Sequence, residues 1–212
     1  MTHDIFGARR GGFANRKGNK KSPQDKAMAV TELKDLLRTA GEDQSIHGRN
    51  AYAMLVIAGN FGLRCSEVID LEFKDFETLH HGYFRVRTLK KKARQEDRAY
   101  TGTRCVKFMK QLLEERREVH KTKLFPFGDR AARYLFAYYA ETAGISPNIS
   151  FHALRHTAAR MLLAAQKDGP LAHVAMNIVE FFLRHAPTST RIYTQPSHED
   201  MIAALNRKEF VS

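Results

Sequence analysis

Five side chains of the types that act on phosphodiesters occur in a fixed order along the chain. In chain order they are Arg64, His152, Arg155, His185 and Tyr193. Cleavage of a phosphodiester without a metal requires a hydroxyl nucleophile, cations on the non-bridging oxygens and groups that carry protons. The set supplies each of these, and it therefore indicates phosphoryl transfer.

The first candidate phosphate ligand lies in residues 152–157, which read HALRHT. His152, Arg155 and His156 fall at positions i, i+3 and i+4, so a helix that begins here carries them on one face. The two histidines have a spacing known from zinc sites, but Ala153 stands where the HExxH motif has its glutamate. We interpret Arg155 as a phosphate ligand, because a guanidinium binds two phosphate oxygens at once. A surface salt bridge is its alternative role, and capping or internal packing is favoured for His156.

The second candidate ligand, Arg64, follows Gly62, a residue that permits a sharp turn. An almost wholly apolar helix leads into this turn and should hold it in place. An ion pair with Glu67 or Asp70 is the alternative role for Arg64.

The candidate nucleophile, Tyr193, lies eight residues after His185 with Pro187 between them. Proline interrupts a helix, so we expect the two side chains to meet across a turn. An unperturbed tyrosine has a pKa of about 10, so attack at neutral pH requires cationic surroundings or a base such as His152. A half-buried core tyrosine is the alternative.

Hydrophobic spacing predicts an α+β fold that is mainly helical, with a small three-stranded antiparallel sheet. The first helix is expected to begin at the capping box Ser22–Asp25 and to end at Gly41. The other helices are expected at about 49–59, 66–71, 103–120, 129–143, 152–166, 170–184 and 197–208. The strands are expected around Phe76, at 83–89 and at 98–101, with 90–97 as an exposed hairpin loop. Residues 1–21 read as a flexible basic arm, and 22–212 as one domain.

Composition indicates a polyanionic partner. The 212 residues carry a formal net charge of +12, with a pI of about 9.8. Nucleic acid is favoured over a membrane because no stretch approaches the roughly 18 apolar residues of a membrane span. The basic N-terminus lacks the apolar region of a secretion signal, and Cys65 and Cys105 stand alone. These features predict a cytoplasmic protein with two buried thiols and no bound cofactor or metal.

Three segments resemble the conserved boxes of the tyrosine recombinase, or phage integrase, family. They are residues 61–71 (FGLRCSEVIDL), residues 151–159 (FHALRHTAA), and the pair LRH at 183–185 with TRIYT at 190–194. The resemblance covers roughly residues 25–205 and keeps the family's order. It implies that Arg64 and Arg155 hold the scissile phosphate, that His152 and His185 assist, and that Tyr193 attacks to form a 3′-phosphotyrosyl intermediate.

The resemblance also implies that a lysine of the hairpin protonates the 5′-oxygen leaving group. Strand alternation places Phe84, Val86, Thr88 and Lys90 on one face, so Lys90 is the first choice. Lys92 is the next candidate.

Several features depart from the family pattern. Arg184 replaces the usual glycine before His185, the interval from His185 to Tyr193 is one residue shorter, and Gln195 stands where a histidine often lies. Only about twenty residues precede the matched region, so the layout resembles the short, stand-alone recombinases of fimbrial phase variation, in which the N-terminal core-binding domain is expected to be absent; a fragment of a longer protein is the alternative.

The expected function is therefore site-specific recombination, of the integrase or invertase type, without a metal or ATP. The expected partners are double-stranded DNA, further copies of the chain on that DNA and accessory DNA-bending proteins, in the nucleoid. A type IB topoisomerase and a DNA-binding regulator that has lost activity are the alternatives. The helix at 197–208 is expected to dock either on a neighbouring subunit or on its own domain.

Overall fold

A computed structural model of the chain describes residues 27–90, 93–118, 120–167, 170, 175–184, 196–208 and 211. For residues 89–90 and 93–95 this description is limited to the backbone. The basic arm predicted at 1–21 and the capping box at Ser22–Asp25 lie outside the described residues. No helix in the described ranges is long and apolar enough to cross a membrane.

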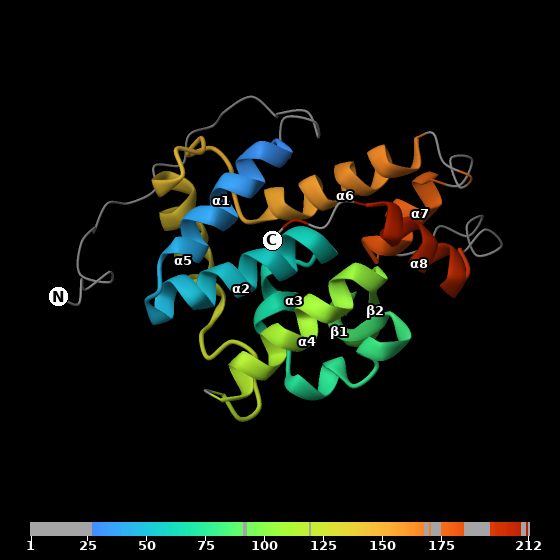
Figure 1. The fold of residues 1–212 in the computed structure, drawn as a ribbon, viewed down its shortest axis with the longest axis horizontal. Coiled ribbons are helices and arrows are strands. Elements are labelled where there is room, and N and C mark those ends of the chain that lie inside the picture. Colours follow the sequence, from blue (N-terminus) through green and yellow to red (C-terminus); the bar gives the residue numbers. More distant parts are fainter. Residues whose placement is uncertain are drawn as a thin grey trace.

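Helix α2 (Ile46–Phe61) forms the centre of the fold. Twelve of its residues are buried, because α1 (Val30–Glu42), α5 (Asp129–Thr142) and α6 (His152–Gln166) pack around it (Figure 1). The helix is longer than predicted, since the Ser45 side chain accepts a hydrogen bond from Gly48 N and starts it one turn earlier. The C-terminal half of α2 is tightly packed, so the loop that leaves its C-terminus is held firmly.

The first helix begins later than predicted. Residues 27–29 are not helical, and α1 starts at Val30 after Ala29. The Glu32 carboxylate accepts a hydrogen bond from Ala29 N at 2.6 Å and so satisfies a donor at the start of this helix. The predicted apolar face is confirmed, because Leu33, Leu36, Leu37 and Ala40 are all buried.

The prediction of a third strand is wrong. Phe76 belongs to a 3₁₀ helix, η2 (Phe73–Phe76), and the sheet in the described residues has two strands. Asp75 accepts a hydrogen bond from Glu72 N at 2.8 Å, which closes a tight turn. Phe73 and Phe76 then lie three residues apart on one buried side of η2, so burial is achieved without a strand.

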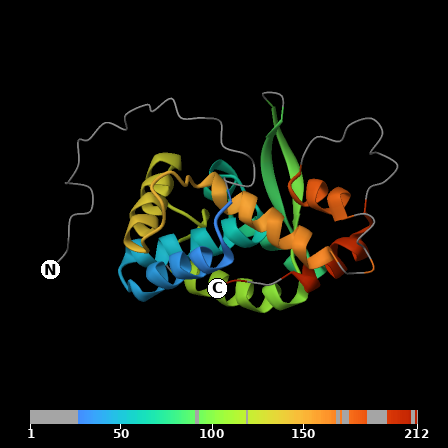
Figure 2. The same ribbon diagram turned by 90° about the horizontal axis from the view of Figure 1, so that it is seen from above.

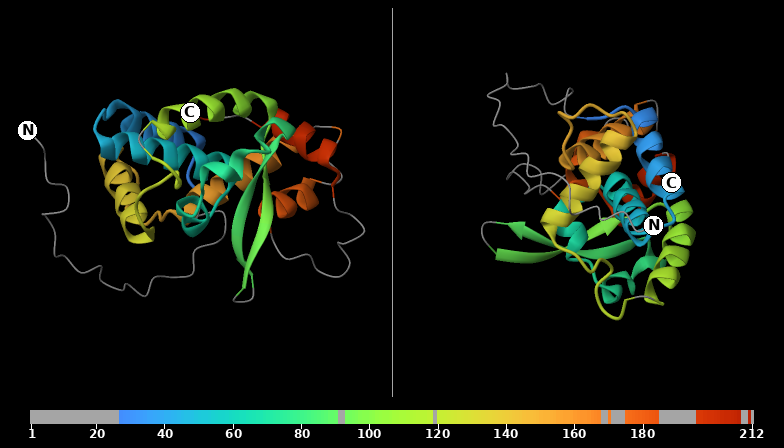
Figure 3. Two further views of the ribbon diagram at one scale, coloured as in Figure 1. Left: turned by 90° about the horizontal axis from the view of Figure 1, so that it is seen from below. Right: turned by 90° about the vertical axis from the view of Figure 1, so that its left-hand side faces the viewer.

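Strands β1 (Tyr83–Lys90) and β2 (Ala93–Tyr100) form an antiparallel hairpin that pairs Tyr83 with Tyr100 and Lys90 with Ala93. A second 3₁₀ helix, η3 (Leu79–His81), precedes it. The predicted loop at 90–97 is too long, since β2 begins at Ala93. Phe84, Val86 and Thr88 are buried, which confirms the predicted inner face for these three residues. The hairpin projects from the body on the side opposite α4 (Thr103–Arg117) (Figures 2 and 3).

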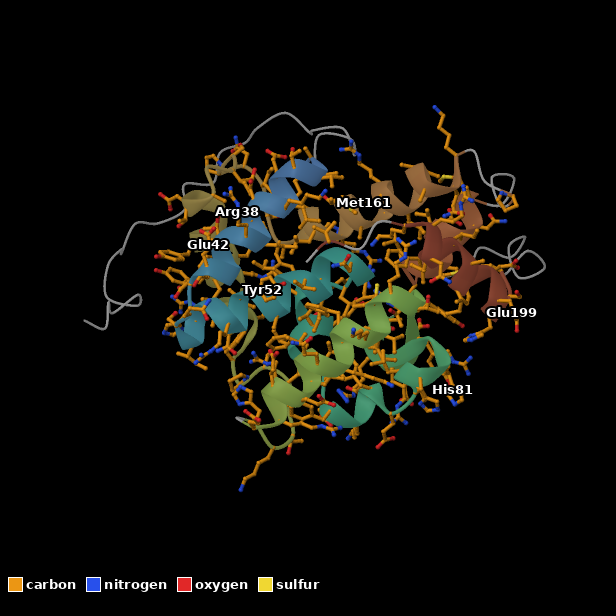
Figure 4. All side chains as sticks on the ribbon, in the orientation of Figure 1. Arg38, Glu42, Tyr52, His81, Met161 and Glu199 are labelled. Carbon is orange, nitrogen blue, oxygen red and sulfur yellow. The ribbon has the colours of Figure 1, made fainter. Side chains whose placement is uncertain are left out.

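A second hydrophobic cluster joins the C-terminal half of α6 to α7 (Ala175–Phe182) and α8 (His198–Arg207). Of the two expectations for the last helix, the described structure bears out packing on its own domain. Met201 and Ala204 are fully buried, and Gln166 Nε2 donates to Ala204 O at 3.0 Å. Figure 4 shows His81 and Glu199 at the same end of the molecule, where the N-terminus of α8 meets the base of the hairpin.

The residues after α8 return to the central helix. Asn60 Nδ2 donates to Val211 O at 2.7 Å, and Val211 N donates to Asn60 Oδ1 at 3.0 Å. Lys208 Nζ also donates to Asn60 O at 2.9 Å. Val211 is buried in the main core, so both ends of α8 are fixed to the body.

Candidate functional site

The first part of the site is the turn between α2 and α3 (Cys65–Ile69), which we call the Arg64 turn (residues 62–64). Gly62 ends α2 with a left-handed φ of 59°, a conformation that favours glycine. A Cβ at this position would meet Phe182 Cε1 at 2.9 Å and Leu183 Cδ2 at 3.2 Å. The turn is therefore pressed against the C-terminal end of α7, more than a hundred residues away in sequence.

Arg64 lies at the start of α3 and pairs with Glu67. Its backbone N donates to Glu67 Oε2 at 2.8 Å, and its Nη1 donates to Glu67 Oε1 at 2.6 Å. The Arg64 side chain is 41% exposed, whereas that of Glu67 is 2% exposed. The ion pair considered as an alternative role is thus present, and it still leaves part of the guanidinium open to an incoming anion.

Helix α6 supplies the second part of the site from its first turn. His152 is exposed, and its ring contacts that of His156 edge-on at a centroid distance of 4.7 Å. Arg155 turns inward and is 3% exposed. Its Nη1 donates to Gly62 O at 2.6 Å and its Nη2 donates to Leu183 O, so Arg155 links the Arg64 turn to the end of α7.

The third part is Arg184, which sequence reasoning had noted only as a departure from the family pattern. It follows α7 and has a side chain that is 1% exposed. Its Nη2 donates to Glu67 Oε2 at 3.1 Å and to Gly62 O at 3.2 Å. Glu67 was likewise missed as a central residue. The signal for Glu67 was its position three residues after Arg64, where glutamates that cap a helix occur. The signal for Arg184 was an arginine at a position where the family usually has glycine.

Three guanidinium groups therefore surround one buried carboxylate. Arg155 Nη1 is 3.9 Å from Glu67 Oε2, a longer contact than those of Arg64 and Arg184. Burial lowers the pKa of Arg155 to about 9, and the neighbouring Arg184 and Arg64 act in the same direction while Glu67 opposes them. Three cations against one carboxylate leave a net charge of +2, which suits a phosphate that gains negative charge during the reaction.

Glu67 should make the stability of the protein depend on pH. Burial raises the pKa of its carboxyl, but Arg184 and the Arg64 backbone and side chain lower it more, so the pKa lies below its usual 4.5. A lowered carboxyl pKa contributes stability above the unfolded value, and this contribution is lost as the pH falls through the folded value. We expect the unfolding free energy, measured in urea from pH 7 to pH 3, to fall in the acid range.

In Glu67→Gln this part of the acid dependence should disappear. The variant should also be less stable at pH 7 by about 3–5 kcal/mol, because buried guanidinium groups lose their counter-charge. Glu114→Gln, on the exposed face of α4, is the matched control. An unchanged acid profile in Glu67→Gln would contradict this assignment.

The remaining candidates lie outside the described atoms. His185, Tyr193 and Lys92 fall outside the described residues, and Lys90 is described only as the last backbone position of β1. Their roles stay predictions.

Metal ligands are not grouped in the part of the chain that the structure describes, where no cluster of three or more His, Cys, Asp or Glu side chains could hold an ion. Both cysteines are buried and unpaired, as predicted, and burial raises the pKa of the Cys65 thiol to about 12.

A family model and a related protein of known function both match this chain. A family model described as the phage integrase family matches residues 26–199. The tyrosine recombinase XerC of Thermodesulfovibrio yellowstonii is 27% identical over 199 residues, which cover 88% of this chain and 63% of that protein.

Solved structures show the same fold. The integrase of mycobacterium phage Brujita matches with a TM-score of 0.60 at 21% identity, covering 91% of this chain and 62% of that one. A lambda integrase dimer bound to a COC′ core site matches with a TM-score of 0.57 at 15% identity, covering 86% and 51%. The chain thus spans less than two thirds of the length of these relatives.

Proposed function

Because the chain belongs to the phage integrase family of tyrosine recombinases, we propose that it cleaves and rejoins DNA in site-specific recombination. The observation that carries the proposal is the meeting of Arg64 and Arg155 at Glu67. These arginines come from segments about ninety residues apart, and Arg155 Nη1 and Arg64 Nη1 lie 3.9 Å and 2.6 Å from the two oxygens of one carboxylate. Two guanidinium groups at one point match the charge of a scissile phosphate.

In the proposed reaction the Tyr193 hydroxyl attacks the scissile phosphorus, and His152 accepts its proton. The bond from phosphorus to the 5′-oxygen breaks, leaving a 3′-phosphotyrosyl link and a 5′-hydroxyl. Arg64 and Arg155 stabilise the charge on the non-bridging oxygens, and His185 assists them. Lys90 gives its proton to the 5′-oxygen, which is a strong base as it leaves.

Rejoining runs the same steps in reverse with a 5′-hydroxyl from another strand. The phosphotyrosyl link conserves the energy of the broken bond, so the proposed reaction uses neither ATP nor a metal. The expected partners are double-stranded DNA, other copies of this chain and accessory DNA-bending proteins. Support for DNA comes from the net charge of +12 and from the DNA-bound dimer of the lambda integrase relative.

The test is covalent capture on nicked DNA. Duplexes tiled across the genomic flanks of the gene, each nicked one step beyond a candidate scissile phosphate, release the short 5′-hydroxyl fragment and trap the intermediate. We expect a protein–DNA adduct that survives denaturation. Supercoil relaxation by isolated monomers would favour a topoisomerase instead, and binding without an adduct on a verified recombination site would favour a regulator.

The assignment of the proton donor has its own test. We expect Lys90→Met to slow cleavage of ordinary DNA by roughly 10²–10⁴-fold, the range for a lost general acid. DNA with sulfur in place of the 5′-bridging oxygen should be cleaved by Lys90→Met at the wild-type rate, because a thiolate leaves without a proton. Single-turnover cleavage of both substrates measures this.

Lys92→Met and Lys91→Met are the matched controls and should cleave both substrates normally. Rescue of Lys92→Met by the sulfur substrate, with Lys90→Met unaffected, would transfer the role to Lys92.

A further inference from the structure

Arg184 adopts a backbone conformation that an arginine avoids. Its φ is 54°, and it is the single non-glycine residue with positive φ among the described residues. The position follows the last turn of α7, where Arg184 N donates to Phe181 O at 2.9 Å. Glycine normally occupies such a site, because a side chain there costs conformational free energy. The arginine must therefore be held by its side-chain interactions.

Those interactions reach two backbone carbonyls and one side-chain carboxylate. Arg184 Nη1 donates to Phe182 O at 2.8 Å, and Nη2 donates to Gly62 O and to Glu67 Oε2. The guanidinium is almost completely excluded from solvent, and the unpartnered Nε is also buried. A buried cation in such a place depends on its carboxylate partner, so Arg184 and Glu67 must act as a pair.

This pair also controls the environment of Arg155. Both arginines donate to Gly62 O, and Arg184 occupies the Glu67 oxygen that lies 3.9 Å from Arg155 Nη1. While Arg184 holds that oxygen, Arg155 stays hydrogen-bonded to Gly62 O and Leu183 O. Without Arg184, Glu67 Oε2 loses its guanidinium partner and can approach Arg155 more closely than the present 3.9 Å.

We propose that Arg184 is a positioning residue for the cleavage reaction. Its guanidinium binds Gly62 O and Glu67, which holds the end of α7 against the Arg64 turn, and it keeps the contact between Arg155 and Glu67 at 3.9 Å instead of a closer ion pair. The inference rests on the proposed function, because it concerns the rate of strand cleavage. A glycine at position 184 could not make these contacts, because it has no side chain.

The test compares single-turnover cleavage of the nicked duplex by wild type, Arg184→Gly and Arg184→Ala. Glycine relieves the backbone and alanine does not, but both remove the guanidinium. We expect both to slow cleavage by about 10- to 100-fold, as misplaced reacting groups do, with the Kd for DNA unchanged within about twofold. Arg38→Ala, which removes an exposed cation of α1, should cleave as wild type does and controls for the loss of one charge.

Two further measurements separate positioning from simple loss of structure. Guanidinium ion at a non-denaturing concentration should restore part of the rate in Arg184→Gly, while matched sodium chloride should not. When Arg184→Gly is added to Glu67→Gln, cleavage should be less than about threefold slower than in Glu67→Gln alone, because the two residues act as one unit.

Wild-type rates in both Arg184 variants would overturn the inference. The inference would also be overturned if Arg184→Gly cleaves slowly, guanidinium does not restore its rate, and the substitution slows cleavage by the same factor in the Glu67→Gln background as in the wild type. If Arg184→Gly does not fold, Arg184→Lys replaces it, because lysine keeps the charge but lacks the planar fork with which Arg184 Nη1 and Nη2 bind Phe182 O, Gly62 O and Glu67. A wild-type rate in Arg184→Lys would then overturn it. Absence of an adduct with the wild-type protein on a verified site would instead count against the proposed function.

Discussion

Tyr193→Phe should form no covalent adduct with nicked DNA and should still bind that DNA with an unchanged Kd. The substitution removes one oxygen, and with it the atom that would attack phosphorus. We expect the amount of adduct to fall by at least about 10³-fold, since loss of a nucleophile removes nearly all of a covalent pathway. Denaturing electrophoresis of the trapped complex gives the amount, and a mobility-shift titration gives the Kd.

Tyr138→Phe is the matched control, because Tyr138 is an exposed tyrosine on α5, away from the site. It should form the adduct at the wild-type rate. An adduct in Tyr193→Phe would assign the nucleophile to another residue, which digestion and mass measurement of the linked peptide would identify.

Arg155→Lys should lose both activity and stability, although it keeps the positive charge. Lysine carries its donors on one nitrogen, so it cannot reproduce the planar fork with which Arg155 Nη1 binds Gly62 O and Nη2 binds Leu183 O. Leu183 O would lose its partner, whereas Gly62 O would keep the hydrogen bond from Arg184, and a buried carbonyl without a partner costs about 1–3 kcal/mol. We expect a loss of about 1–3 kcal/mol in unfolding free energy by urea denaturation, and a fall in cleavage of about 100-fold or more.

Arg64→Lys makes the informative contrast. The Arg64 side chain is 41% exposed and makes its ion pair within one helical turn, so its loss should reduce cleavage with a much smaller change in stability. Arg160→Lys, at an exposed position on α6, should change neither quantity. Equal stability of Arg155→Lys and wild type would mean that the link that Arg155 makes between the Arg64 turn and the end of α7 is not important for the fold.

The local features of this fold were predictable from sequence because they depend on short spacing. The apolar face of α1, the buried run of α2 and the alternation of Phe84, Val86 and Thr88 each have a period set by one element. The prediction of a third strand was wrong because it rested on Phe76, and one buried aromatic residue does not distinguish a strand from a 3₁₀ turn. The spacing of Phe73 and Phe76 fits the turn, which a hydrogen bond from Glu72 N to Asp75 closes.

The hairpin loop was predicted too long because its residues are charged. Charge excludes residues from a core but not from a strand that projects into solvent, where backbone pairing suffices.

The candidate site was predictable in its residue types and only partly in its geometry. Arg64 and Arg155 were singled out from sequence, but Glu67 and Arg184 were not recognised as the residues that connect them. Their contact joins positions more than a hundred residues apart, and no periodicity within one helix reports such an approach. The burial of Arg184 depends on the close packing of Gly62 against the end of α7, which is a tertiary property.

The return of the chain from Val211 to Asn60 has a consequence for biosynthesis. Helix α2 leaves the ribosome early, and the side-chain amide of Asn60 near its C-terminal end can donate to Val56 O within the helix, but its two hydrogen bonds with Val211 form only when residue 211 has been made. Contacts between such distant residues form late, because the loop that joins them must close first. On a nascent chain, the end of α2 beside the Arg64 turn remains incomplete. The DNA-cutting site that we propose would therefore mature only after translation of this segment is finished.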